Sequence, residues 1–360
     1  VSESFSGRMD QMVNKIFTDP DYLDSQKTLH FQQTRNQDKI VVPNLNPFAA
    51  ISMICKRSLP EIERSKGAGY LFYETTKGFH FRSWESLCVD KGGNLRDAVQ
   101  FFRYVQGNMQ EEQDMLSGRK GERTMTDRIL QNYKNVRDYR FTNNFHDVAA
   151  NTAMGTYGHR VISYNLYDKS FNAESFHYHD MFNETIHADF DDDEKSRDKE
   201  AVRGNPVDYD DKNLSDYNES LVSLIPTTQY LHNDETGSFG TDVKNDALFE
   251  GVRNGMAMQI QTGTALQLTV KGQSYIQPGQ VIDFSLRPVE EEGMTSDKKS
   301  YDPQYSGRYV ITKIRHRVVK QDYKMVLECR KDSVREQLPG KTIRTFAGIS
   351  NNENAQFTKL

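Results

Sequence analysis

The stretch that most constrains the fold of this chain lies between residues 265 and 330, where four short segments show β periodicity. Pro278 and Gly279 mark a turn into the second segment, and a polar turn at 320–322 separates the last two. The four segments are 265–273, 276–284, 309–317 and 323–330. Alternating apolar and polar residues joined by turns are typical of neighbouring antiparallel strands. The sequence therefore predicts an antiparallel β unit here.

The first ninety residues combine two helix signals with one hairpin signal. Apolar residues recur at helical spacing within 6–17. A second helix is expected from Pro47, because Asn46 can cap its first turn and proline is favoured at the first helical position. Aromatic residues alternate on both sides of the turn 75–78. This pattern predicts a β-hairpin that follows the second helix.

The order of these elements resembles a known family. Ile276-Gln-Pro-Gly before a strand, Gly307 and Tyr309 at the start of the third segment, and the helix followed by the hairpin core at 69–83 are similar to the baseplate central hub proteins of T-even-like contractile-tailed phages. Gly155, Gly158 and the segment 159–168 are similar to the first strand pair of that family's second tube domain. None of these residues carries a catalytic signature.

The resemblance implies a structural role and no enzymatic activity or cofactor. Hub proteins form a trimeric ring that joins the tail tube to the central spike and lets genomic DNA pass through the lumen. The implied partners are further copies of the chain, the tail tube protein, other baseplate proteins and a spike protein that can carry a lysozyme module, with no membrane. The implied location is the baseplate of the virion tail, after assembly in the host cytoplasm.

The resemblance also implies a division of the chain. The expected fold class is α+β, with a helix-and-hairpin domain at 1–120 and a tube-type antiparallel β-barrel at 121–172 and 255–335. An acidic insertion is expected at 173–254, because that region contains the run 189–194 and few helix or strand signals, and an extended tail is expected at 336–360. The family's first tube domain has no counterpart after Val1, so it is expected upstream in a longer protein or on a separate chain.

Composition narrows the function further. The net charge is −5 and the cations are spread along the 360 residues, which gives no electrostatic case for general nucleic-acid binding. No apolar run is long enough to span a bilayer. Cys55, Cys88 and Cys329 lack the spacing of a metal site and leave an odd thiol under any pairing, which fits synthesis in a reducing cytosol.

The histidines near residue 180 provide a second alternative, in a different class of function. His177 and His179 would lie on one face of a strand, and His187, Asp180 or Asp189 could complete a zinc shell. A metal-dependent hydrolase built on His177, His179 and His187 is therefore one alternative. The other interpretation is an acidic surface insertion, which is favoured because the spacing matches no known zinc site. The first alternative to the phage hub, ahead of the hydrolase, is the hub of a contractile injection or secretion apparatus.

The last two predicted strands carry the candidate interface residues. Cations alternate with apolar residues there, so strand geometry should place several of them on one face. The candidates are Arg315, Arg317, Lys320 and Lys324. A solvated outer face and a contact surface for an acidic tube or spike partner both remain open.

Overall fold

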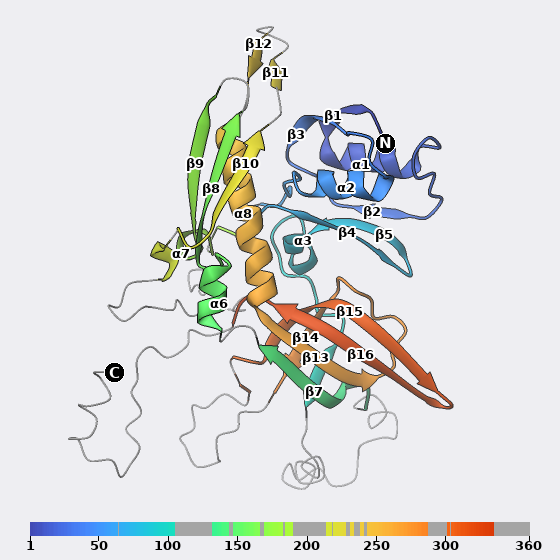
Figure 1. The fold of residues 1–360 in the computed structure, drawn as a ribbon. Coiled ribbons are helices and arrows are strands. Elements are labelled where there is room, and N and C mark those ends of the chain that lie inside the picture. The colour runs from blue at the N-terminus through green and yellow to red at the C-terminus, as the bar shows by residue number, and fades with distance from the viewer. Residues whose placement is uncertain are drawn as a thin grey trace, which may run out of the picture.

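The computed structural model contains an N-terminal module, a sheet covered by a long helix, and a closed β-barrel (Figure 1). The described residues are 1–63, 65–104, 132–143, 147–165, 169–182, 184–189, 214–217, 219–227, 231–233, 238–240, 243–286, 301–302 and 304–334. Within them, no helix is long and apolar enough to cross a membrane.

The N-terminal module packs two helices against two small sheets. Its elements are β1 (Ser4–Arg8), α1 (Met9–Thr18), β2 (Leu29–Phe31), β3 (Gln37–Val41), α2 (Pro47–Cys55), β4 (Tyr70–Thr75), β5 (Gly78–Ser83) and α3 (Trp84–Cys88). β1 pairs with β3, and β5 lies between β2 and β4. Ile16 of α1, Ile51 of α2 and Phe81 of β5 are fully buried in one core.

Local sequence signals account for this module. The Asn46 side chain accepts a hydrogen bond from the Ala49 amide at 2.7 Å, which confirms the predicted cap of α2. β4 and β5 form the predicted antiparallel hairpin. The first helix begins at Met9 instead of at residue 6, because the preceding residues form β1 and pair with β3.

Six strands close the barrel in the order β13-β16-β15-β14-β6-β7. Their bounds are β6 (Phe101–Tyr104), β7 (Asn135–Asn143), β13 (Thr264–Lys271), β14 (Val281–Ser285), β15 (Gly307–Val319) and β16 (Asp322–Lys331). Alternate residues of β13 and β16, such as Leu266, Leu268 and Leu327, fill the barrel core. The alternation in the sequence therefore marks the residues that face inward.

The expectation of a purely antiparallel barrel is wrong. β6 runs parallel to both β14 and β7, whereas the other four pairings in the barrel are antiparallel. Parallel neighbours need a long connection, and the chain between β6 and β7 is long enough to provide one. β6 also lies within residues 1–120, so the expected helix-and-hairpin domain contributes a strand to the barrel.

A separate three-stranded sheet lies beside the barrel, with α8 packed along it (Figure 1). Its strands are β8 (Gly158–Asn165), β9 (Phe171–His177) and β10 (Val222–Thr227), and α8 covers Val243–Thr262. The smaller elements are α6 (Val148–Ala153), α7 (Tyr178–Phe182), η2 (Leu214–Asp216), β11 (Leu231–Asn233) and β12 (Ser238–Gly240). β8 pairs with β9 and β10, so the expected place of 158–165 in the barrel is wrong.

The region 173–254 contains more regular structure than its acidic composition indicated. It supplies most of β9, all of β10 and the first half of α8. The buried His159 ring joins this sheet to the helix, because its two nitrogens lie 3.1 Å from the carbonyl oxygens of Gly155 and Gly251. The run 190–194 and the expected tail at 336–360 lie outside the described residues.

Candidate functional site

The hairpin formed by β15 and β16 extends past the barrel (Figure 1). Val318 and Val319, next to its turn, are 68% and 49% exposed. The turn is tight, since Lys320 takes a left-handed φ of 54°. A pair of exposed β-branched residues at a projecting tip offers apolar surface that the barrel itself does not cover.

The outer face of the hairpin is cationic. Arg315 and Arg317 alternate on β15, and Arg317 lies directly opposite Lys324 on β16. This register brings three of the four candidate residues to one face, whereas Lys320 lies in the turn. Arg315, Arg317 and Lys320 are exposed and make no ion pair within the described residues.

Lys324 differs from the other three candidates because it already has a partner. Its Nζ lies 2.6 Å from Asp322, and Arg137 of β7 lies 3.5 Å from the same carboxylate. The hydrogen bond from Lys324 lowers the pKa of Asp322, with the charges of both cations acting in the same direction. The outer face therefore remains positive, since Lys324 and Arg137 share one carboxylate while Arg315 and Arg317 have no ion-pair partner within the described residues.

The inner face of the hairpin is apolar and aromatic. His316 lies opposite Met325, and Val318 lies opposite Tyr323. The hydroxyl of Tyr323 and Nδ1 of His316 are 2.9 Å apart, with the two rings stacked. The row of inward-facing residues in the barrel thus continues along the hairpin into solvent, which gives the tip two chemically different faces.

One edge of β15 is open beyond the barrel. β14 pairs with β15 only as far as Val310, and the turn before β14 adds hydrogen bonds at Ile311. Further along β15, the described residues include no second strand beside the stretch 313–319. Backbone N–H and C=O groups on such an edge are suited to pairing with a strand from another chain.

The structure separates the histidines of the zinc alternative. Nδ1 of His177 contacts the Ser215 carbonyl at 2.9 Å, whereas the buried His187 contacts Asp332. Asp180 is exposed, and Asp189 lies 3.6 Å from the buried Lys331 amine. The side chain of His179 lies outside the described residues. Among the residues that the structure describes, no group of three or more potential ligands could hold a metal ion.

A buried polar cluster joins the N-terminal module to the end of β16, and nothing in the sequence analysis indicated it. The Asp332 carboxylate lies 3.0 Å from Nδ1 of His187 and accepts the Ala188 amide at 3.0 Å. Glu85 of α3 accepts the Ile186 amide at 2.9 Å and the Ser65 hydroxyl. These contacts bring three distant segments together without offering an open reaction site.

Opposing effects set the acidity of the two carboxyl groups in this cluster. Burial raises the pKa of Asp332, but the His187 charge and hydrogen bond and the Ala188 amide outweigh it, so the pKa falls below 3.8. Burial dominates at Glu85 and raises its pKa above 4.5, although the Ser65 and Ile186 hydrogen bonds act against it. Both pKa shifts follow from structural contacts.

All three cysteines are free and buried. Burial raises the pKa of Cys55 to about 12 and raises the pKa of Cys88 and Cys329 as well. Because the thiolate is the reactive form, these side chains act as small apolar core residues.

Comparison with known proteins identifies no family model and no curated protein that matches this chain. The solved structures that align with this chain include two tail proteins. A tail protein from Neisseria meningitidis aligns over 92% of this chain and 69% of its own length, with 8% identity and a TM-score of 0.44. The 43 kDa tail protein of prophage MuSo2 from Shewanella oneidensis aligns over 91% and 65%, with 9% identity and a TM-score of 0.40.

Proposed function

We propose that this chain is a structural subunit of a contractile phage tail, the baseplate hub. In this proposal three copies form a ring that connects the tail tube to the central spike and lets DNA pass. The observation that carries the proposal is the projecting hairpin with its open β15 edge, exposed tip and two different faces. The order of strands in the sequence, which resembles the hub family, supports the same interpretation.

The barrel geometry explains why the hairpin is the natural place for subunit contact. Within the described part of the barrel each strand pairs with a neighbour on both sides over at least part of its length, which limits the edge that the barrel wall exposes. The open edge at 313–319 can instead receive a strand of the next copy. In a closed ring each subunit offers and receives one such contact, so the contacts close only at a fixed number of copies.

The cationic outer face then binds the neighbouring components of the tail. Arg315 and Arg317, which make no ion pair within the described residues, can pair with carboxylates of a tube or spike protein, and Lys320 extends the same positive surface into the turn. Exposed charges of this kind steer association and set the register of docking more than they add affinity. The proposal therefore assigns ring formation to the edge and the tip, and recognition of partners to the cations.

Light scattering during size exclusion tests the ring. The wild-type chain is expected at the mass of a trimer, whereas Val318→Asp should shift it toward the monomer, because it places a charge in an apolar contact. Val41→Asp is the matched control, since Val41 is 72% exposed on β3, away from the hairpin, and should leave the trimer intact. A Val318→Asp variant that remains fully trimeric would place the contact elsewhere.

Metal content read on the same peak tests the alternative. A monomer that carries one zinc ion per chain would contradict the hub proposal and return attention to His177 and His187. Loss of Arg315 and Arg317 together, as Arg315→Gln and Arg317→Gln, should leave the mass of the ring unchanged. Its effect is expected in binding to isolated tail tubes or spikes, at low more than at high salt.

A further inference from the structure

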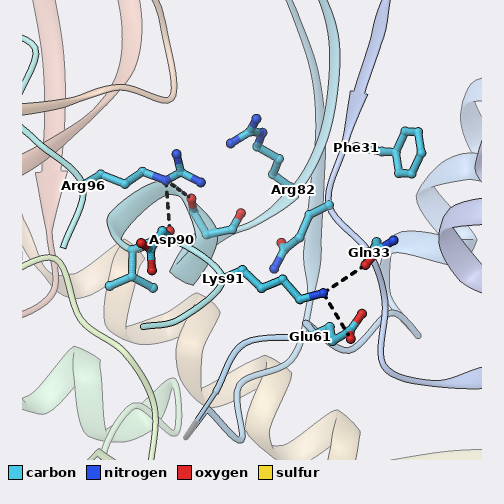
Figure 2. A pocket seen from close by; sticks show the side chains of 10 residues that line it. Phe31, Gln33, Glu61, Arg82, Asp90, Lys91 and Arg96 are labelled. Atoms are coloured by element: carbon cyan, nitrogen blue, oxygen red, sulfur yellow. Dashed lines mark hydrogen bonds and ion pairs between the residues drawn. The ribbon is translucent and has the colours of Figure 1, made fainter. Parts of the chain in front are cut away.

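A pocket of about 380 Å³ opens in the N-terminal module between β2, β5 and the loop after α3 (Figure 2). Arg82, Lys91 and Arg96 line it together with two acidic residues, Glu61 and Asp90. It lies away from the β15–β16 hairpin and is independent of the hub proposal.

Arg82 is the unusual residue of this pocket. Its side chain is half-buried, and its Nε atom is buried without a hydrogen-bond partner. Within the described residues the Arg82 guanidinium makes no hydrogen bond and no ion pair. Burial, followed by the nearby charge of Arg96, lowers its pKa. A desolvated cation with no acceptor destabilises the free protein, so its position calls for a ligand.

Arg96 is held in place and faces the same space. Its Nε donates to the carbonyl oxygens of Ser86 at 2.8 Å and Val89 at 2.9 Å. Figure 2 shows the guanidinium groups of Arg82 and Arg96 extending toward each other from opposite sides of the pocket. The terminal nitrogens of Arg96 have no partner within the described part of the chain. Two guanidinium groups in this arrangement match an oxyanion, which guanidinium forks bind through paired hydrogen bonds.

The acidic residues of the pocket make no hydrogen bond or ion pair with these two arginines within the described residues, although the Arg96 charge contributes, after the Asn94 hydrogen bonds, to the lowered pKa of Asp90. Asp90 accepts the Asn94 amide at 2.8 Å, which ties it to the loop. Glu61 pairs with Lys91 at 3.4 Å on the other side of the pocket. The second oxygen of Glu61 is buried and has no hydrogen-bond partner. The pocket therefore offers unused donors at one end and an unused acceptor at the other.

We propose that this pocket binds an acidic side chain of an extended peptide segment on a partner protein. The carboxylate lies between Arg82 and Arg96, and a backbone N–H of the same segment donates to Glu61. Phe31, which is 45% exposed at the rim, packs against the peptide. A free phosphate satisfies the arginines, but its negative charge repels the Glu61 carboxylate, whereas a peptide brings a neutral N–H donor to it, so the peptide is the better match.

Fluorescence anisotropy with a labelled peptide of alternating glycine and aspartate tests the site. The wild-type chain is expected to bind it, and the matched glycine–asparagine peptide should not bind. Arg82→Gln and Arg96→Gln should each weaken binding by about tenfold or more, the usual effect of losing a charge-assisted hydrogen bond. Lys56→Gln removes an exposed cation at the end of α2, outside the pocket, and should leave binding unchanged.

Thermal unfolding of the same variants separates binding from folding. Arg82→Met should raise the Tm of the free protein while abolishing peptide binding, because it removes a desolvated charge that has no partner. Wild-type affinity in Arg82→Gln would overturn the proposal. An equal loss of peptide affinity in Lys56→Gln would mean that net charge, and not this pocket, determines binding, and would also overturn the proposal. Displacement of the peptide by inorganic phosphate at an equal concentration would show a simple oxyanion site instead.

Discussion

At the scale of single residues, the strongest constraint is the placement of ionisable groups where water is excluded. Glu85 is fully buried in α3 and is held by the Ser65 hydroxyl and the Ile186 amide. These two hydrogen bonds do not offset burial, so the pKa of Glu85 is raised. The carboxyl group therefore connects two segments of the chain, while its burial disfavours its ionised form.

Glu85→Gln should therefore stabilise the protein at neutral pH, by on the order of 1 kcal/mol. The glutamine keeps an oxygen for Ile186, and its amide can donate to Ser65. Because the folded pKa of Glu85 is raised, its contribution to stability is complete below about 4.5 and is lost as the pH rises through the folded value. Urea unfolding at several pH values checks this.

The advantage of the Glu85→Gln variant should appear above pH 4.5 and vanish below it. Glu63→Gln is the matched control, because Glu63 is exposed and its substitution should leave the pH profile parallel to wild type. A variant whose advantage grows as the pH falls would mean that Glu85 is ionised favourably in the folded state.

At the scale of elements, α8 shows how close packing can hide a helix in the sequence. Two glycines, Gly251 and Gly255, lie on the side of α8 that meets β8 and β9. A Cβ atom at Gly255 would lie 2.1 Å from the Phe176 ring, whereas a Cβ at Gly251 would have ordinary contacts of 3.8 Å or more. The face that packs most closely thus lacks the large apolar residues that mark a helix.

Two alanine substitutions in this helix should have opposite effects. Gly255→Ala should lower the free energy of unfolding by roughly 1–3 kcal/mol, because the new methyl group displaces Phe176. Gly251→Ala should raise it by up to about 1 kcal/mol, the helix propensity difference between the two residues. Thermal or urea unfolding of both variants measures these changes in the free energy of unfolding. Equal effects would mean that Phe176 can move aside.

The sequence predicted those elements whose signals are local. Alternation located β13, β15 and β16, and Asn46 located the start of α2. Partner choice was not predictable in the same way, because β6 is a four-residue strand whose neighbour β14 lies far along the chain. Membership of β8 in a second sheet is likewise decided by tertiary contacts.

The same distinction between local signals and tertiary contacts applies to the candidate site. The shared face of Arg315, Arg317 and Lys324 follows from the two-residue period of a strand, and the register agrees with it. Its role as an interface stays a prediction. The pocket between Arg82 and Arg96 could not be predicted from the sequence. Two separate arginines form a site only when the fold brings them to one pocket and leaves Arg82 without a carboxylate partner within the described residues.

At the scale of the whole molecule, the buried cluster around Asp332 joins separate parts of the chain. Asp332 follows β16 of the barrel, whereas its contacts His187 and Ala188 belong to the segment after α7. The amide of the preceding residue, Ile186, donates to Glu85 of the N-terminal module. The placement of the barrel relative to the module therefore rests on this polar cluster together with a buried apolar cluster that contains Trp84, Ile186 and Val310.

Asp332→Ala should lower the free energy of unfolding by roughly 3–5 kcal/mol, the usual cost of removing one member of a buried ion pair. Asp332→Asn should cost less, since its oxygen can still accept the Ala188 amide. Because the folded pKa of Asp332 is lowered, the wild-type contribution is present above about pH 3.8 and is lost as the pH falls through the folded value. Denaturant titration of both variants measures the difference.

The two Asp332 variants should also differ in how cooperatively they unfold. If the cluster couples the barrel to the module, Asp332→Ala should separate the unfolding of the two parts into distinct steps, visible as unequal transitions by different probes. Trp84 fluorescence reports on the contact between the module and the barrel, where Trp84 packs with Val281 and Val310, and far-ultraviolet circular dichroism reports on the whole chain. Coincident transitions in Asp332→Ala would mean that apolar contacts between the parts suffice.

The closure of the barrel by strands that lie far apart in the sequence has a consequence for biosynthesis. β6 begins at Phe101, but β16, which pairs with β13 and β15, ends only at Lys331. The nascent chain can therefore complete its N-terminal module on the ribosome before the barrel strands β13 to β16 have been translated. Because β16 is the last described strand of the barrel to be translated, a chain interrupted before it has an incomplete barrel and no projecting hairpin.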